Sequence, residues 1–191
     1  MRLLIDIAIA LLIAAVLGLV TAWYAVDRGP LFGGMAAGPW KAWPSSGSPD
    51  ADPYSIARLA RTGEVPLGAG EGLAFTARTD QDGRPLEGNC TYRLDGTTPA
   101  ARLWTLTAYD ANGRLMANAA RRTGFQSREI LRRPDGSFAI SVSEEVQPGN
   151  WLPVATDGPF SLVLRLYDTP LTTGGAVADS MMPRIEREGC R

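Results

Sequence analysis

The chain has 191 residues, of which 45% are hydrophobic, and its 19 basic and 20 acidic side chains give a formal net charge of −1. This balance lacks the excess of positive charge that marks nucleic-acid-binding proteins, so we expect no nucleic-acid partner. The absence of histidine excludes triads and dyads with a histidine base and leaves only two cysteines and carboxylates as zinc ligands, so we expect neither metal nor cofactor.

Residues 1–28 are predicted to form a transmembrane anchor. Residues 3–26 are almost entirely apolar, and no charge occurs over residues 7–26. A helix needs about 20 such residues to cross a bilayer. Trp23 and Tyr24 lie near the end of the run, where aromatic side chains favour the headgroup boundary. We therefore expect residues 3–26 to contact the lipid bilayer in a single pass through a bacterial inner membrane, with the globular domain in the periplasm.

A cleaved signal peptide is the alternative interpretation of this segment. The small residues at Val20–Ala22 form an acceptable cleavage pattern. The apolar run is longer than the roughly 7–15 residues of a signal-peptide core, which favours an uncleaved anchor. Both interpretations export the remainder of the chain.

Residues 29–51 are predicted to form a linker, because Gly, Pro, Ser and Ala dominate and no hydrophobic period persists. Trp40 and Trp43 are unusual for a linker. They lie either at the membrane interface or, in the simpler interpretation, against the domain.

The domain is expected over residues 52–191, and a short helix is predicted at its start. Asp52 suits the N-cap and Pro53 the first helical position. Gly63 then ends the apolar pattern. We expect roughly two to three turns of helix that lead into a sheet.

Beyond this helix the hydrophobic pattern alternates, which indicates β-strands. The alternating rows are Leu73, Phe75 and Ala77; Trp104, Leu106 and Ala108; Leu115, Ala117 and Ala119; Phe138, Ile140 and Val142; and Leu162, Leu164 and Leu166. The sequences DQDG, DANG and RPDG supply turns between strands. No long helical pattern intervenes, so we predict a mainly β fold, an antiparallel jelly-roll-like β-sandwich. The tail of the chain is expected to return irregularly across the sandwich.

The two cysteines, Cys90 and Cys190, are predicted to form a disulfide, because an exported domain folds in an oxidising compartment. Such a bridge closes a loop of about a hundred residues, which the chain-entropy model values at up to about 4–5 kcal/mol. Two free buried thiols are the alternative.

Two turn sequences, Asp80–Gly83 and Tyr109–Gly113, resemble the start of a calcium loop. Both lack the further oxygen ligands and the closing glutamate of that loop, so polar turns are favoured. Glu144 and Glu145 are adjacent and, on a strand, would face opposite sides. We therefore do not expect them to act as an acid–base pair.

Four side chains are the candidates for ligand binding: Tyr109, Trp151, Arg165 and Tyr167. Trp151 is either an exposed stacking platform or a plug at one end of the sandwich, and its apolar neighbours favour the plug. Arg165 and Tyr167 alternate on the polar face of one strand. No catalytic residue is assigned; for an enzyme that cleaves a uronate polymer, Tyr109 or Tyr167 as a base beside Arg165 is the expected pair.

A cluster of arginines could receive an anionic polymer or a phosphate. Its members are Arg121, Arg122, Arg128, Arg132 and Arg133. Such residues more often pair with local carboxylates on polar strand faces, which is the favoured interpretation.

Four phrases of the sequence occur in a characteristic order: ARLWTLTAYDANGRLMAN, PDGSFAISVS, GNWLPVATDGPFSLVLRLYDTP and MPRI. Over roughly residues 73–185 the chain thereby resembles the bacterial domain of unknown function 1214. The resemblance implies a jelly-roll-like β-sandwich and brings no catalytic residues. In longer members of the family the domain follows a domain of unknown function 1254. The resemblance therefore implies a short, membrane-anchored form that works beside a separate partner chain of the 1254 type.

The function predicted from these features is that of a binding or accessory module in the cell envelope. The alternative is an enzyme, or an enzyme subunit, that acts on an envelope carbohydrate or polymer without histidine.

Overall fold

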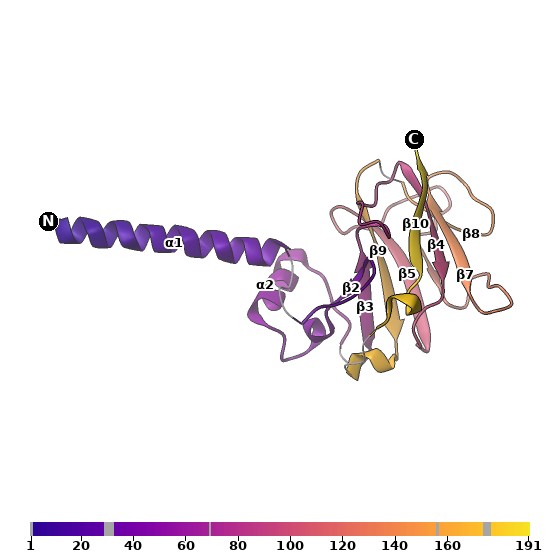
Figure 1. The fold of residues 1–191 in the computed structure, drawn as a ribbon, viewed down its shortest axis with the longest axis horizontal. Coiled ribbons are helices and arrows are strands. Elements are labelled where there is room, and N and C mark those ends of the chain that lie inside the picture. The colour runs from indigo at the N-terminus through magenta and orange to yellow at the C-terminus, as the bar shows by residue number, and fades with distance from the viewer. Residues whose placement is uncertain (1, 29–32, 69, 156, 174–176) are drawn as a thin grey trace. The chain divides into compact units, whose positions relative to one another are not determined.

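The computed structural model describes residues 2–28, 33–68, 70–155, 157–173 and 177–191 (Figure 1). The chain divides into two compact units, residues 1–33 with 45–66 and residues 34–44 with 67–191. The first, the helical unit, holds the two α-helices, and the second, the β unit, holds every strand of the described residues.

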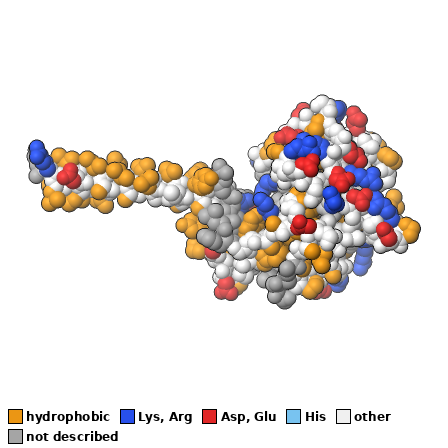
Figure 2. Space-filling view, viewed as in Figure 1, with side chains coloured by type: hydrophobic (Ala, Val, Ile, Leu, Met, Phe, Trp, Pro, Cys, Tyr) orange, Lys and Arg blue, Asp and Glu red, His pale blue; other side chains and the backbone are white. Residues whose placement is uncertain are grey.

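The helical unit begins with α1 (Arg2–Arg28), the only described helix that is long and apolar enough to be a membrane span or a signal sequence. The side chains from Leu3 to Tyr24 are exposed, and the hydrophobic ones cover the visible face of this helix in Figure 2. A helix with apolar side chains all around needs an apolar surrounding. A short 3-10 helix, η1 (Pro44–Gly47), precedes the second α-helix.

The second helix, α2 (Pro53–Thr62), begins and ends where the sequence predicts. The Asp52 carboxylate accepts hydrogen bonds from the backbone N–H groups of Tyr54 and Ser55 at 3.0 and 3.1 Å, which is N-cap geometry. Gly63 ends the helix at φ 68°, a left-handed conformation that glycine adopts without strain.

The β unit contains a six-stranded and a four-stranded sheet (Figure 1). The six-stranded sheet has the order β1 (Met35–Ala37), β2 (Trp40–Ala42), β3 (Gly72–Ala77), β9 (Phe160–Tyr167), β5 (Leu103–Asp110) and β6 (Gly124–Gln126). The four-stranded sheet has the order β10 (Arg184–Cys190), β4 (Cys90–Gly96), β7 (Phe138–Ser143) and β8 (Asn150–Pro153). All neighbours are antiparallel except β7 and β8, which are parallel. The mainly β prediction is confirmed, whereas this strand order does not by itself establish a jelly roll.

Both sheets contribute to one hydrophobic core. The predicted rows of β3, β7 and β9 are buried, and Leu164 of β9 lies in register with Phe75 on one side and Leu106 on the other. Two aromatic pairs join the sheets: Tyr92 and Phe160, with ring centroids 5.7 Å apart, and Trp104 and Phe138, at 5.2 Å. The inward faces of the two sheets therefore meet.

Part of the segment predicted as a linker belongs to the six-stranded sheet. β1 and β2 pair with each other around Gly38, and β2 pairs with β3. Trp40 is fully buried, and its indole Nε1–H donates to the carbonyl oxygen of Pro183 at 2.8 Å. Three-residue strands are too short to show a period among glycines and prolines, which is why the sequence did not reveal them. The start of the predicted linker, residues 29–32, lies outside the described residues.

The row Leu115, Ala117 and Ala119 was predicted as a strand, and that prediction is wrong. Only an isolated bridge joins Tyr109 to Leu115, and β6 supplies the next partner of β5. Leu115 is 55% exposed, so the alternation had no buried face behind it.

The end of the chain is more regular than predicted, because residues 184–190 form β10 at the edge of the four-stranded sheet. Two short 3-10 helices, η2 (Pro170–Thr173) and η3 (Asp179–Met181), come before it. Cys190 lies in register with Cys90 of β4, and the two residues form the predicted disulfide. Only Ile185 of β10 is fully buried, so its sequence shows little hydrophobic alternation.

Candidate functional site

Three of the four predicted ligand residues lie on the outer face of the six-stranded sheet. Buried and half-buried positions alternate along β5 and β9, and Tyr109, Arg165 and Tyr167 occupy half-buried positions that point away from the core. The Arg165 guanidinium carbon lies 5.5 Å from the centroid of the Tyr109 ring. A cation–π contact of this kind contributes about 0.5–1 kcal/mol at an exposed site. We name Tyr109, Arg165 and Tyr167 the tyrosine–arginine face.

The neighbours of this face are small side chains, of which several carry a hydroxyl group. Arg165 lies in register with Thr105, and the adjacent pair of the two strands is Val163 with Thr107. Thr76 of β3 lies on the other side of Val163. The face is therefore a sheet surface on which threonine hydroxyl groups lie beside one cation.

Trp151 is not part of this face, because it lies on β8 of the other sheet. It is half-buried, and its indole Nε1–H donates to the carbonyl oxygen of Ser143 at 3.1 Å. Its own carbonyl oxygen accepts from the Arg122 side chain at 3.1 Å. The structure thus brings Arg165 against Tyr109 and places Tyr167 at the far end of the same sheet face. Trp151 lies on the other sheet.

A buried carboxylate, Asp80, forms the centre of a polar cluster in the β unit. Asp80 is 2% exposed, and its side chain accepts hydrogen bonds from the backbone N–H groups of Asp82 and Arg84 at 3.0 and 2.9 Å. The Arg187 Nε lies 2.9 Å and the Arg84 Nε 3.2 Å from its second oxygen. Burial alone would raise the pKa of Asp80, but the Arg84 N–H and the charges of Arg187 and Arg84 outweigh burial and lower it.

Arg187 reaches this carboxylate from β10 and satisfies further groups on the way. Its guanidinium lies over the Tyr92 ring, 5.3 Å from the centroid, and donates to the carbonyl oxygen of Pro85. Its Nη1 lies 3.8 Å from the sulfur atoms of both Cys90 and Cys190. One arginine therefore connects the 80–84 turn, β4 and the disulfide.

Tyr92 completes the cluster, because its hydroxyl accepts the backbone N–H of Glu87 at 2.8 Å. Burial raises the pKa of Tyr92. Within the described residues, no buried side-chain nitrogen or oxygen lacks a hydrogen-bond partner. A cluster that is satisfied internally has no group left for a substrate, so we interpret Asp80, Arg187 and Tyr92 as a structural lock.

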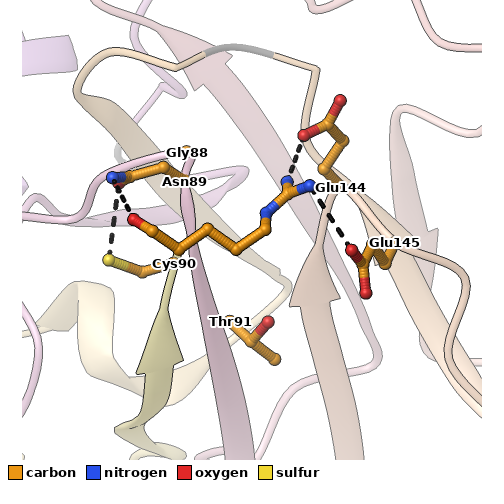
Figure 3. A pocket seen from close by; sticks show the side chains of 7 residues that line it. Gly88, Asn89, Cys90, Thr91, Glu144 and Glu145 are labelled. Atoms are coloured by element: carbon orange, nitrogen blue, oxygen red, sulfur yellow. Dashed lines mark hydrogen bonds and ion pairs between the residues drawn. The ribbon is translucent and has the colours of Figure 1, made fainter.

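A small cavity of about 70 Å³ lies beside the disulfide (Figure 3). The side chains of Glu144 and Glu145 point to one guanidinium, that of Arg191, which pairs with both. The two glutamates follow the end of β7, so the strand alternation that we expected to separate them does not apply. All three side chains are more than half exposed, and they form a solvated strand end.

Three of the five arginines of the cluster contact nearby groups of the β unit. Arg133 pairs with Asp95 through two contacts of 3.0 and 2.6 Å, and Arg132 donates to the carbonyl oxygen of Gly136 at 2.8 Å. On the visible face of the β unit in Figure 2, acidic and basic side chains are intermixed. These contacts fit local pairing better than an anion-binding patch.

The part of the chain that the structure describes contains no group of three or more cysteine, aspartate or glutamate residues that could hold a metal ion. In the turns weighed as calcium loops, the carboxylates of Asp80 and Asp110 accept backbone N–H groups of their own turns. Both segments are therefore polar turns.

The sequence indicates a polar turn at Asp80 but does not reveal its buried ion pair or Arg187, the residue that ties it to β10. Arg187 lies in a tail of alternating charges, and this pattern does not indicate which side chains face the core. The predicted disulfide does not locate Arg187 either, because regular pairing from Cys190 and Cys90 would set it opposite Arg93. An irregularity between Arg187 and Gly189 brings it opposite Tyr92 instead.

The model of a family described as a protein of unknown function (DUF1214) matches residues 71–171. Among solved structures, the VPA0106 protein from Vibrio parahaemolyticus is similar with a TM-score of 0.59 and 24% identity, over 73% of this chain and 36% of that protein. An uncharacterised protein from Burkholderia cenocepacia shares 21% identity over 75% of this chain and 45% of its own, with a TM-score of 0.45. This chain thus spans less than half of either protein. No curated protein matches it.

Proposed function

Because this chain belongs to the DUF1214 family, whose function is unknown, we propose a function from the molecule itself: an exported binding or accessory module of the cell envelope. In this proposal α1 anchors the protein in the inner membrane of a bacterium, and the β unit lies in the periplasm. We interpret its two sheets, which share one core, as a β-sandwich whose outer faces meet a partner.

The observation that carries the proposal is the combination of an exposed apolar helix with a disulfide in one chain. An apolar helix of this length suits a bilayer, and disulfides persist in oxidising compartments such as the periplasm. Either feature alone is weak evidence, but both fit a β unit that lies outside the cytoplasm.

The tyrosine–arginine face is the surface that we propose for the partner. Tyrosine and arginine are enriched where proteins bind one another, and Arg165 already lies against the Tyr109 ring. A domain of the 1254 type is the partner that the family resemblance suggests.

Protease accessibility tests the location. Added protease should digest the β unit in spheroplasts and leave it intact in whole cells, and unreduced extracts should contain the Cys90–Cys190 bridge. A β unit that stays protected in spheroplasts until the membrane is lysed would place it in the cytoplasm and overturn the proposal.

Affinity capture from solubilised membranes tests the binding role. The full-length protein should retain one stoichiometric chain, and Arg165→Ala should reduce its recovery. Arg184→Ala on β10 is the matched control, because Arg184 is an exposed arginine of the other sheet. Recovery of this chain alone, or equal losses in both variants, would contradict the proposed face. Turnover of an envelope polymer that Tyr109→Phe abolishes would instead favour the enzyme alternative.

A further inference from the structure

The helix α2 turns its apolar side toward the surface of the helical unit. Ile56 is 53% exposed, and Ala57 and Ala60 are exposed as well, whereas the buried residue of the helix is Ser55, at 3%. At 3.6 residues per turn, Ile56, Ala57 and Ala60 lie on one side of the helix. Helices of soluble domains generally bury such a side, so this side suits a further apolar surrounding.

The last turn of α2 is fixed to the end of α1. Arg61 Nη2 lies 3.0 Å from Asp27 Oδ1, and the Arg61 guanidinium carbon lies 4.0 Å from the centroid of the Trp23 ring. At a rise of 1.5 Å per residue, Trp23 and Asp27 are about 6 Å apart along α1. Aromatic residues at the end of a membrane span lie at the headgroup level. Arg61 therefore places the end of α2 at the same depth.

The remaining side chains of α2 suit a helix that lies along a membrane surface. Tyr54, 42% exposed, stands beside the apolar side, and a tyrosine ring with a polar tip favours the boundary between lipid and water. Thr62 lies on the opposite side of the helix and is exposed. An amphipathic helix of this kind binds in the interface with its apolar side toward the acyl chains.

We propose that α2 lies in the headgroup layer of the bilayer that α1 crosses, with Ile56, Ala57 and Ala60 facing the acyl chains. The proposal rests on the proposed role of α1 as a membrane anchor. It assigns a second membrane contact to the chain, made by a lipid surface on α2.

Depth-dependent quenching of a fluorophore in the full-length protein tests this proposal. Single variants Ala60→Cys, Thr62→Cys and Ala15→Cys are labelled with a thiol-reactive nitrobenzoxadiazole without reductant, since the native cysteines are bonded to each other. The proteins are reconstituted in vesicles of equal parts phosphatidylcholine and phosphatidylglycerol. Quenchers are lipids with a nitroxide near the headgroup, lipids with a nitroxide deep in the chain, and aqueous iodide.

We expect the probe at position 60 to be quenched by the shallow nitroxide and protected from iodide, and the probe at position 62 to show the reverse. The probe at position 15 should respond to the deep nitroxide. Ile56→Glu, a substitution at an exposed position, should make the probe at position 60 accessible to quenching by iodide.

Three results would overturn the proposal, and they are distinguishable. If position 15 responds to the deep nitroxide while positions 60 and 62 behave alike, the anchor stands and the lipid contact of α2 is wrong. If position 60 is protected from iodide but insensitive to both nitroxides, protein covers the helix instead of lipid. If position 15 is insensitive to the deep nitroxide, the anchor itself is wrong.

Discussion

Residues 80–84 and 110–114 form two turns of the β unit with the same pattern, Asp-x-x-Gly-Arg. In each, the N–H of the first residue donates to the carbonyl oxygen of the fifth, at 2.8 and 2.9 Å. In each, the carboxylate of the aspartate accepts the N–H of the arginine, at 2.9 and 2.8 Å. Gly83 and Gly113 both take positive φ, 81° and 73°. The local sequence therefore determines the backbone of both turns.

The two turns differ in what contacts them from a distance in the sequence. Asp80 is buried and paired with Arg187, 107 residues away. Asp110 is half-buried, and the hydrogen bonds recorded for its carboxylate within the described chain come from its own turn. A turn motif of this kind therefore determines the local backbone, whereas the free-energy cost of changing it depends on long-range contacts.

Replacement of the two aspartates should give the largest difference between the turns. Asp80→Asn removes the charge that balances Arg187, whose side chain is 16% exposed, and should lower the free energy of unfolding by about 3 kcal/mol. Asp110→Asn keeps an oxygen acceptor at a half-buried position and should cost at most about 1 kcal/mol. Urea unfolding of the full-length protein in mild detergent, followed by tryptophan fluorescence, measures both.

Arg187→Ala is the reciprocal variant, and its cost should overlap with that of Asp80→Asn in a double-mutant cycle. Additive costs would show that the ion pair does not couple β10 to the turn. Equal costs for the two asparagine variants would remove the distinction between the turns.

Loss of the disulfide should give the next largest difference between the two turns. Serine at both Cys90 and Cys190 should lower the free energy of unfolding by about 2–4 kcal/mol. Since β10 carries both Cys190 and Arg187, its release should also loosen the lock. Hydrogen exchange should therefore accelerate over residues 80–84 and remain unchanged over residues 110–114. Equal acceleration of both turns would indicate global destabilisation without a selective link.

The stability of the protein should depend on pH through Asp80. Its pKa is lower in the folded protein than in the unfolded chain, so Asp80 stabilises the fold above its unfolded pKa, about 3.9. This contribution is lost as the pH falls from that value through the lower folded pKa. Asp80→Asn should therefore make the fall of stability in acid shallower, as measured by thermal unfolding across this range. The Arg133 hydrogen bond lowers the pKa of Asp95 as well, so the stability of the Asp80→Asn variant should still fall in acid, but less steeply. Parallel curves for wild type and variant would contradict the assignment to Asp80.

Much of the fold could be predicted because its signals are local or periodic. The caps of α2 and the buried rows of β3, β7 and β9 follow from residue spacing. The strands β1 and β2 could not be predicted, since three residues carry no period. The row from Leu115 to Ala119 misled because alternation shows a strand only where one side becomes buried.

The site was less predictable, because it depends on which sheet each strand joins. The alternation within one strand predicted that Arg165 and Tyr167 share a face, and the structure confirms it. Tyr109 joins them, and Trp151 does not, because β5 neighbours β9 whereas β8 lies in the other sheet. Strand order is a long-range property that local patterns do not contain.

Replacement of the two turn glycines should give the smallest difference and so provides the sharpest check on the comparison. An added Cβ meets no atom within 4 Å at Gly83 or at Gly113, so only the positive φ opposes Ala, at about 1 kcal/mol in each turn. Gly83→Ala and Gly113→Ala should therefore shift the urea midpoint equally, although the neighbouring aspartates differ several-fold in their cost. A clearly larger shift for Gly83→Ala would mean that the Arg187 contact restrains the backbone of the 80–84 turn, and the difference between the turns would then extend beyond their side chains.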